Sequence, residues 1–401
     1  MNEIEAYRQF SKILNKLQPY SIELGLDRVK AVLKNLGNPQ NNFQSIVVGG
    51  TNGKGSVCQF LTDAFIDAGL NVGTYTSPHL IQINERFKMN NKPISYSLLL
   101  EYANYLKSKI DRAQLTYFEF LTVLAFLVFS RLGVDIAILE VGMGGEFDAV
   151  NTTNPILSIL THISLDHKEY LGNTHKEITK TKMKIIRALG VIGKNSKIVT
   201  NTIKTNTKAR LFFVDDNYLK KAKEINAKMQ GLALKENLAT AMLAIDVLNN
   251  EYGFNLDYDS FKKSFWQGRF EVIHSGKKIF ILDGAHNINA ALKLVSSLKN
   301  YREEKLLIFS ALKHKDWKNV LKILIPHFNK IILTSLSQHK LSENPINIKT
   351  YIKNKKVSIA NNTNEAIERF LKEKENIAVI TGSLYLIGEA KASPINIDFL
   401  P

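Results

Sequence analysis

Short apolar runs alternate with stretches of helical periodicity along most of the chain. The runs are rich in Val, Ile and Leu, and glycine or polar residues bound them. Continuous apolar runs of this length are typical of parallel strands covered on both faces, with helices as the crossovers between them. The pattern therefore predicts an α/β fold with a mostly parallel sheet.

The runs fall into two series that predict two domains. In the first series we expect strands at residues 45–48, 134–141, 156–163 and 197–200 and a buried helix at 120–129, an apolar stretch too short to span a bilayer. In the second we expect strands at 278–282, 305–310, 330–334 and 377–381 and a helix at 290–298. The pattern breaks at residues 266–269, where Gly268 precedes the second series. We therefore expect a large domain at residues 1–268 and a smaller, Rossmann-like α/β domain at 269–401.

The composition is that of a folded protein from a reducing compartment. Of the 401 residues, 45% are apolar and 22% are charged, as in average globular domains. The single cysteine, Cys58, cannot form an internal disulfide, and the start MNEIEAYRQF lacks the apolar run of a signal peptide. We expect a cytoplasmic protein with no membrane partner.

The net charge of +16 is compatible with several classes of ligand. Such a balance suits nucleic acid, membrane surfaces or small anions. The lysines are scattered, as at Lys220, Lys221 and Lys223, without a dense basic block or interleaved aromatic residues. A solvated basic surface is the favoured interpretation, and nucleic-acid binding is kept as an alternative.

A glycine-rich turn follows the first predicted strand, in the segment SIVVGGTNGKGSVCQFLTDAFIDAG. Backbone amides in such a turn and the start of the following helix attract phosphate. Lys54 can reach the β- and γ-phosphates, and Ser56 can bind Mg²⁺. Gly55 between them departs from the strict GxxxxGK[ST] spacing. We predict a nucleoside triphosphate site.

Polar residues stand at the ends of three further apolar runs, where open α/β sheets bind ligands. They are Ser77 in YTSPHL, Glu140 in ILEVGMGG, and Asp166 with His167 in SLDHKEYLGNT. Ser77 and Glu140 offer oxygen ligands to Mg²⁺. His167 is either a metal ligand or a structural histidine.

Nine motifs occur in a fixed order: GGTNGKGS, YTSPHL, TYFEF, ILEVGMGG with FDAVN, LDH with LGNT, NLATA, GRFE, DGAHN and TGSLYLIGE. This order, over residues 20–390, resembles the folylpolyglutamate synthase and dihydrofolate synthase family of ATP-dependent ligases, within the Mur ligase superfamily. The resemblance implies a Mur-ligase-like central domain with a P-loop. Only 49 residues precede Gly50, too few for the UDP-binding domain of the cell-wall ligases, and this favours the folate branch.

The resemblance implies a reaction in two steps. A substrate carboxylate attacks the γ-phosphate of ATP to form an acyl phosphate, and the amine of L-glutamate then displaces phosphate. ATP and Mg²⁺, at two sites, are the implied cofactors. The implied phosphate-binding residues are Thr51, Asn52, Gly53, Lys54, Gly55 and Ser56, and the implied metal ligands are Ser56, Ser77, Glu140 and His167, with Lys54 and His167 also catalytic.

Similar enzymes use a carbamylated lysine to support the second magnesium. The segment here reads THKEITKTKMKIIRALG, where the family has EKAGI. Lys182 shares a helical face with Ile178, whereas Lys180 and Lys184 project away from it. We choose Lys182 as the catalytic, metal-supporting lysine. Because its neighbours differ from the family's, an unmodified lysine on a solvated face remains the alternative.

Further ATP contacts are implied for Asn237 of NLATA, Arg269 of GRFE, and Asp283 and His286 of DGAHN. The alternative for Asp283 is a helix N-cap. Ser383 in TGSLYLIGE is a candidate for binding glutamate. The smaller domain would thus complete the ATP and glutamate sites.

The resemblance also implies where the pterin end of the acceptor binds. Flat aromatic rings stack on a flat pterin, and core packing is the alternative for Phe118 and Phe120. The loop GGEFDAVN departs from the family's GGRLDATN, so Glu146 stands where the family has an arginine. The implied substrate-binding residues are Glu23, Leu24, Gly25, Tyr117, Phe118, Glu119, Phe120, Glu146, Phe147 and Asp148.

The leading hypothesis is a monomeric ligase that adds L-glutamate to dihydropteroate and to reduced folates. A Mur-type ligase acting on another carboxylate is the second. A basic, ATP-regulated nucleic-acid-binding protein is the third, and steep salt dependence of binding would identify it.

Overall fold

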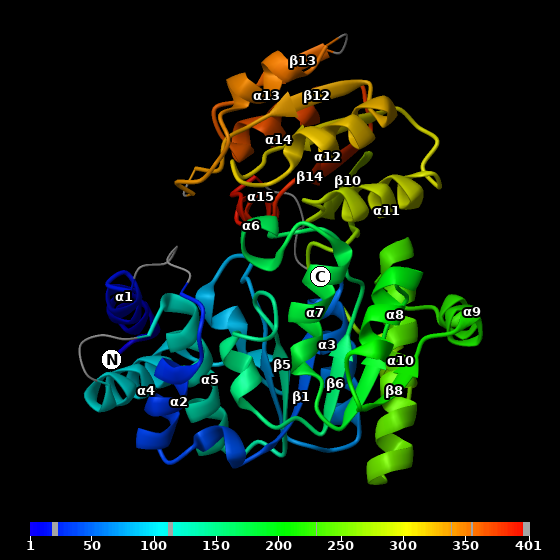
Figure 1. Ribbon diagram of the computed structural model, residues 1–401. Coiled ribbons are helices and arrows are strands. Elements are labelled where there is room, and N and C mark those ends of the chain that lie inside the picture. The colour runs from blue at the N-terminus through cyan, green and yellow to red at the C-terminus, as the bar shows by residue number, and fades with distance from the viewer. Residues whose placement is uncertain (18–22, 111–114, 230, 338, 354–355, 396–401) are drawn as a thin grey trace. The chain divides into compact units, whose positions relative to one another are not determined.

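The structure is a computed structural model that describes residues 1–17, 23–110, 115–229, 231–337, 339–353 and 356–395. The chain forms two compact units (Figure 1). Unit 1 comprises Met1–Ala227 with Glu236–Ser264, and unit 2 comprises Lys228–Lys235 with Phe265–Pro401. The sequence pattern does not predict that residues 228–235 belong with the second unit.

Unit 1 is built on an eight-stranded sheet of order β4-β3-β2-β5-β1-β6-β7-β8. From β2 to β8 along this order all neighbours are parallel, and β3 and β4 are antiparallel at one edge. The strands are β1 (Gln44–Gly49), β2 (Val72–Tyr75), β3 (Phe87–Met89), β4 (Lys92–Pro93), β5 (Ile136–Glu140), β6 (Leu157–Leu160), β7 (Leu189–Ile192) and β8 (Arg210–Phe213). The mixed α/β class with a mostly parallel sheet is confirmed.

The helices through residue 252 are α1 (Glu3–Leu14), α2 (Asp27–Asn35), α3 (Lys54–Asp67), α4 (Tyr96–Lys109), α5 (Tyr117–Leu132), α6 (Lys168–Leu171), α7 (His175–Lys182), α8 (Lys197–Thr205), α9 (Asp216–Glu224) and α10 (Leu232–Tyr252). Helices α1, α2, α4 and α5 pack together as one group (Figure 1). Helix α3 packs on strands β1, β2 and β5.

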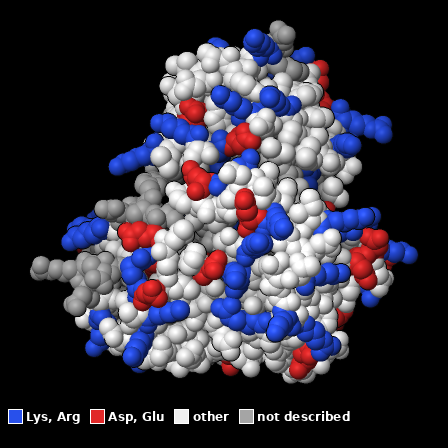
Figure 2. Space-filling view, viewed as in Figure 1, with Lys and Arg blue, Asp and Glu red and all other residues white. Residues whose placement is uncertain are grey.

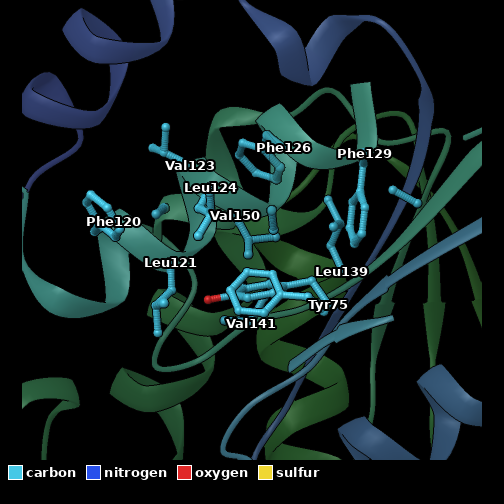
Figure 3. Close-up of a cluster of buried hydrophobic side chains, with 14 of the residues drawn as sticks. Tyr75, Phe120, Leu121, Val123, Leu124, Phe126, Phe129, Leu139, Val141 and Val150 are labelled. Atoms are coloured by element: carbon cyan, nitrogen blue, oxygen red, sulfur yellow. The ribbon is translucent and has the colours of Figure 1, made fainter. Parts of the chain in front are cut away.

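Helix α5 is buried on all sides over most of its length. Every residue from Glu119 to Phe129 is buried, as expected for a helix that is apolar around its whole circumference. A capping box between Thr116 and Glu119 starts it, and Gly133 in the left-handed conformation ends it. Figure 3 shows its side chains packed with residues of the sheet and its loops: Tyr75, Phe120, Leu121, Val123, Leu124, Phe126, Phe129, Leu139, Val141 and Val150.

One predicted strand is wrong. Residues 197–200 begin helix α8, whose N-cap Ser196 accepts a hydrogen bond from the Val199 backbone amide. Val199 and Ile203 are buried at helical spacing, a pattern that a four-residue window is too short to reveal. The neighbouring strands are instead β7, before this helix, and β8, after it.

Unit 2 has a six-stranded sheet of order β13-β12-β11-β14-β10-β9, parallel except for the β9–β10 pair. Its strands are β9 (Glu271–Ser275), β10 (Lys278–Asp283), β11 (Lys305–Phe309), β12 (Lys330–Leu333), β13 (Lys356–Ile359) and β14 (Ile377–Thr381). Its helices are α11 (Ile288–Leu298), α12 (Trp317–Leu324), α13 (Pro345–Tyr351), α14 (Thr363–Leu371) and α15 (Leu384–Lys391). The four predicted strands of the second series are all present as strands.

The surface carries both signs of charge. On the face seen in Figure 2, acidic side chains lie between the basic ones. Within the described parts of the chain, no helix has an apolar stretch long enough to cross a bilayer.

Candidate functional site

The predicted site residues of unit 1 follow four strands that are neighbours in the sheet. Strands β2, β5, β1 and β6 are adjacent and parallel. Their carboxyl ends therefore lie at one edge, where open α/β sheets bind ligands. Ser77 follows β2, Glu140 ends β5, the glycine loop follows β1, and His167 follows β6.

The glycine loop is held by the segment that follows β6. The Thr51 amide donates to the His162 carbonyl at 2.8 Å, and the Thr51 hydroxyl donates to the Ser164 carbonyl at 3.1 Å. Asn52 contacts the Ser164 hydroxyl through its side-chain amide at 3.4 Å. Helix α3 starts after Gly53 without a side-chain cap. An uncapped helix start is favourable for an anion.

Asn237 of α10 packs directly on this loop. Gly53 has φ +94°, and a Cβ there would lie 2.1 Å from Asn237 Oδ1. Asn237 is buried. A residue far along the chain thus belongs to the phosphate loop's surroundings.

Lys54 and Ser77 both approach Glu140. Lys54 Nζ lies 3.8 Å from Glu140 Oε1, and the Ser77 backbone amide donates to Glu140 Oε2 at 3.0 Å. The Ser56 hydroxyl is fully buried and has no hydrogen-bond partner among the described residues. A buried hydroxyl without a partner is costly unless a ligand satisfies it. Ser56 and Glu140 are oxygen donors of the kind that Mg²⁺ prefers, so these residues fit a divalent cation.

Lys182 and His167 occupy different environments. Lys182 ends α7 and is buried, and its Nζ donates to the Gly50 carbonyl at 3.0 Å, whereas Lys180 and Lys184 are exposed. His167 precedes α6 in the left-handed conformation with φ +50°, and its Nε2 lies 4.0 Å from Asp166 Oδ2. Lys182 therefore contacts the phosphate loop, and His167 is paired with an acidic neighbour.

The aromatic residues at the start of α5 differ in their surroundings: some lie near the candidate site and one lies in the core. A Cβ at Gly142 would lie 2.4 Å from the Phe118 ring, so this ring packs on the loop that follows Glu140. Tyr117 is half-buried. Phe120 is fully buried in the core (Figure 3) and offers no surface to a ligand, so we assign it to packing. Glu119 is buried as well and contacts Arg28.

Arg86 is a candidate site residue that the sequence analysis does not identify. It is buried, its Nε donates to His79 Nδ1 at 3.0 Å, and its guanidinium lies 6.0 Å from the centre of the Tyr117 ring. Burial and the nearby Arg86 lower the pKa of His79 to about 3, so the imidazole stays neutral. No carboxylate of the described residues pairs with Arg86. Its position after YTSPHL in the sequence carries no signal of this role.

The loop at residues 146–148 is folded around Asp148. The Asp148 carboxylate accepts the backbone amides of Met143 and Val150, each at 3.0 Å. Its burial raises its pKa to about 6, although these hydrogen bonds oppose the shift. The Glu146 amide donates to the Thr181 carbonyl at 3.1 Å. Phe147 is 45% exposed, so it is the residue of this loop most open to solvent.

The loop at Glu23–Gly25 and the predicted residues of unit 2 complete the set. Glu23 and Leu24 are exposed, and Gly25 has φ +130°. In unit 2, Asp283 ends β10 and accepts the amides of Phe270 and Ala285, each at 2.9 Å. Burial raises the pKa of Asp283, and the charge of Arg269 opposes that shift.

Of the remaining unit 2 residues, His286 follows Asp283 in the chain, and Ser383 follows Thr381, which pairs with Asp283 between β10 and β14. His286 Nδ1 lies 2.8 Å from the Gly284 carbonyl. Ser383 is the N-cap of α15, where it accepts the Tyr385 amide. Asn287, rather than Asp283, caps helix α11, so the alternative of an N-cap role for Asp283 does not hold.

Two family models match this chain. Residues 48–247 match the Mur ligase middle domain, and residues 268–384 match the Mur ligase glutamate ligase domain. Together they span most of both units.

Individual relatives match over almost the full length. A dihydrofolate synthase/folylpolyglutamate synthase of Bacillus subtilis is 30% identical, and the match covers 96% of this chain and 98% of that protein. The Mycobacterium tuberculosis folylpolyglutamate synthase, solved with ADP and AMPPCP, is 25% identical with a TM-score of 0.85 and 98% coverage of both chains. A Yersinia pestis bifunctional folylpolyglutamate synthase/dihydrofolate synthase, solved with AMPPNP and a Mn ion, has a TM-score of 0.83 at 24% identity and covers 96% of this chain and 97% of that one.

Proposed function

The chain belongs to the dihydrofolate synthase/folylpolyglutamate synthase family of Mur ligases, and on that premise we propose that it joins L-glutamate to dihydropteroate and to reduced folates at the expense of ATP. The acceptor carboxylate attacks the γ-phosphorus of ATP, the bond to the bridging oxygen breaks, and ADP leaves as the acyl phosphate forms. The amine of L-glutamate then attacks the acyl carbon, phosphate leaves, and an amide remains.

The observation that carries the proposal is the meeting of Lys54, Glu140 and Asn237 at one glycine loop. Transfer of a phosphoryl group to a carboxylate brings two anions together, so positive charge and close positioning must supply most of the acceleration. Lys54 supplies positive charge at this loop, 3.8 Å from Glu140. The uncapped start of α3 adds a favourable field for the phosphates. Thr51, Asn52 and Gly55 shape the same loop.

Ser56, Ser77, Glu140 and His167 are the residues that would hold divalent cations, and we propose two cation sites. The unpartnered Ser56 hydroxyl supports the first of them. A bound divalent cation would offset the charge of the phosphates. The Ser77 backbone amide holds Glu140 in place by donating a hydrogen bond to its carboxylate.

We also propose that Lys182 is carbamylated in the active enzyme. Its burial and its contact with the Gly50 carbonyl support a role at the loop. The exposed Lys180 and Lys184 are not candidates for it, because a charged carbamate in water would have no partner to position.

The acceptor is proposed to bind along Glu23–Gly25, Tyr117, Phe118 and Phe147. Arg86, a buried cation beside Tyr117, can pair with an acidic group of the acceptor. In unit 2, Arg269, Asp283 and His286 are proposed to contribute to nucleotide binding, and Ser383 to glutamate binding.

Glu146 is proposed to alter the preference among folate forms, since it places a carboxylate where the family has an arginine. A kinetic comparison of Glu146→Arg with the parent enzyme tests this. An unchanged ratio of kcat/KM between dihydropteroate and tetrahydrofolate would remove the idea.

The experiment that tests the function is mass analysis of products formed from ATP, Mg²⁺ and L-glutamate with either dihydropteroate or tetrahydrofolate. The expected products carry one or more added glutamates, together with ADP and phosphate. Phosphate release that does not depend on glutamate, or that needs another acid, would point to the Mur-type alternative. We further propose that the protein is cytoplasmic and monomeric; sedimentation of the purified protein would check the oligomeric state.

A further inference from the structure

Arg28 joins two segments that the sequence places far apart. It is the second residue of α2, and its Nη2 donates both to the Glu23 carbonyl and to Glu119 Oε1, each at 2.9 Å. Its Nη1 also lies 3.5 Å from Glu23 Oε2. A guanidinium is suited to such a bridge because its rigid fork presents several donors at once.

The Glu119 end of this bridge is buried. The Glu119 side chain is 7% exposed, and its second oxygen accepts the Thr116 amide at 2.8 Å to close the capping box of α5. A buried carboxylate with both oxygens engaged fixes its partner far better than an exposed one. The Arg28–Glu119 pair therefore ties the Glu23–Gly25 loop to the first turn of α5.

The first turn of α5 is in turn packed on the loop that follows Glu140. Phe118, next to Glu119, leaves no room for a Cβ at Gly142. The next residue, Met143, donates its amide to Asp148. A continuous set of contacts thus runs from Glu23 through Arg28, Glu119 and Phe118 to the loop after Glu140.

We propose that Arg28 is a positioning residue for the acid substrate. It holds the Glu23–Gly25 loop against the start of α5, so that an acceptor with a flat aromatic head group can bind between this loop and the Phe118 ring. The inference rests on the proposed function for the identity of that acceptor. Arg28 touches no reacting atom and acts through Glu23 and Glu119. Binding of ATP does not depend on it.

Kinetics of single variants test the proposal. Arg28→Gln keeps polarity but removes the charge and the fork, Arg28→Lys keeps the charge with a single ammonium, and Glu119→Gln keeps an oxygen for the cap. The matched control is Arg8→Gln, because Arg8 is 69% exposed and lies 4.0 Å from Glu5.

We expect Arg28→Gln to raise KM for the acceptor by roughly tenfold while KM for ATP stays within about twofold. Arg28→Lys should recover part of the loss. The double variant of Arg28→Gln with Glu119→Gln should lose less than the sum of the two single losses, because both remove the same contact.

Equal changes in KM for ATP and acceptor, or additive losses in the double variant, would overturn the proposal and leave Arg28 with a role in stability alone. Thermal unfolding of each variant, with assays run well below the lowest midpoint, keeps a folding defect from imitating the result. If the parent enzyme adds glutamate to no pterin or folate acceptor, the proposed function fails. If the parent is active and Arg28→Gln behaves like Arg8→Gln, only this inference fails.

Discussion

Asn237 fills the space above Gly53, so that a Cβ on residue 53 would lie 2.1 Å from the Asn237 side-chain oxygen. Asn237 lies on α10 and Gly53 on the phosphate loop, both within unit 1. The φ of Gly53 is +94°. Two reasons therefore favour glycine at this position: the left-handed backbone conformation and the lack of space for a side chain.

Gly53→Ala is expected to weaken the binding of ATP strongly, because the new methyl group must displace Asn237 or the loop. The matched control is Gly69→Ala, where φ is +86° but nothing lies within 4 Å of the added Cβ. Both variants should lose about 1 kcal/mol of stability from the positive φ. Isothermal titration with a non-hydrolysable ATP analogue measures the difference. Equal affinities in the two variants would contradict the assignment of Asn237 to the nucleotide site.

Lys54→Ala is expected to lower kcat by at least about a hundredfold, the scale seen when one electrostatic group that stabilises a transition state is removed. Lys197→Ala is its control, since Lys197 also begins a helix but is exposed. Coupled ADP release with saturating substrates measures both. A Lys54→Ala enzyme that ligates at the parental rate would exclude the phosphate-loop role.

Asp148 makes the stability of unit 1 depend on pH. Its pKa is raised from 3.8 to about 6 by burial, so between these pH values the folded state holds a proton that the unfolded state has released. Stability from this group is therefore present at low pH and is lost as pH rises through about 6. Asp148→Asn cannot titrate.

We compare the free energies of unfolding of the parent and of Asp148→Asn. The excess of the parent's value over the variant's should fall by about 1 to 2 kcal/mol between about pH 4.5 and about pH 7.5. Urea unfolding followed by circular dichroism measures it. A constant difference over this range would mean that Asp148 keeps an ordinary pKa, and a rising one would mean that its pKa is lowered in the folded state.

Lys391 and Glu271 form a buried ion pair in unit 2, with side chains 4% and 5% exposed and a distance of 2.5 Å. Lys391→Met leaves Glu271 buried without its cation and should cost about 3 to 5 kcal/mol. Lys374→Met breaks the exposed Lys374–Glu304 pair of the same unit and should cost under about 1 kcal/mol.

Both tryptophans, Trp266 and Trp317, belong to unit 2, so their fluorescence during urea unfolding reports on the unit that Lys391 stabilises. Comparable midpoints for Lys391→Met and the parent would show that the pair contributes little.

Local pattern was enough to predict strands β1, β5 and β6 of unit 1 and β10, β11, β12 and β14 of unit 2, but it missed others, among them the buried strand β7. The buried parallel strands that were predicted are mostly apolar, as in residues 377–380, and are recognisable without any tertiary information. A strand is predicted at residues 197–200, where the structure has the start of helix α8, because a window of four residues fits the helical period and the strand period equally well. The edge strands β4, β8, β9 and β13, and β3 beside β4, carry too few buried positions to stand out from the loops.

The sequence by itself determined the α/β class, the phosphate loop with Lys54 and the polar residues at the ends of β2, β5 and β6, because these depend on spacing within short segments. It could not determine the order of those strands. Only the tertiary structure decided that Asn237 covers Gly53, that Lys182 contacts Gly50, that Phe120 belongs to the core, and that Arg28 joins Glu23 to Glu119. Each of these contacts brings together residues distant along the chain or depends on how side chains share a limited volume, and neither property is encoded in local periodicity.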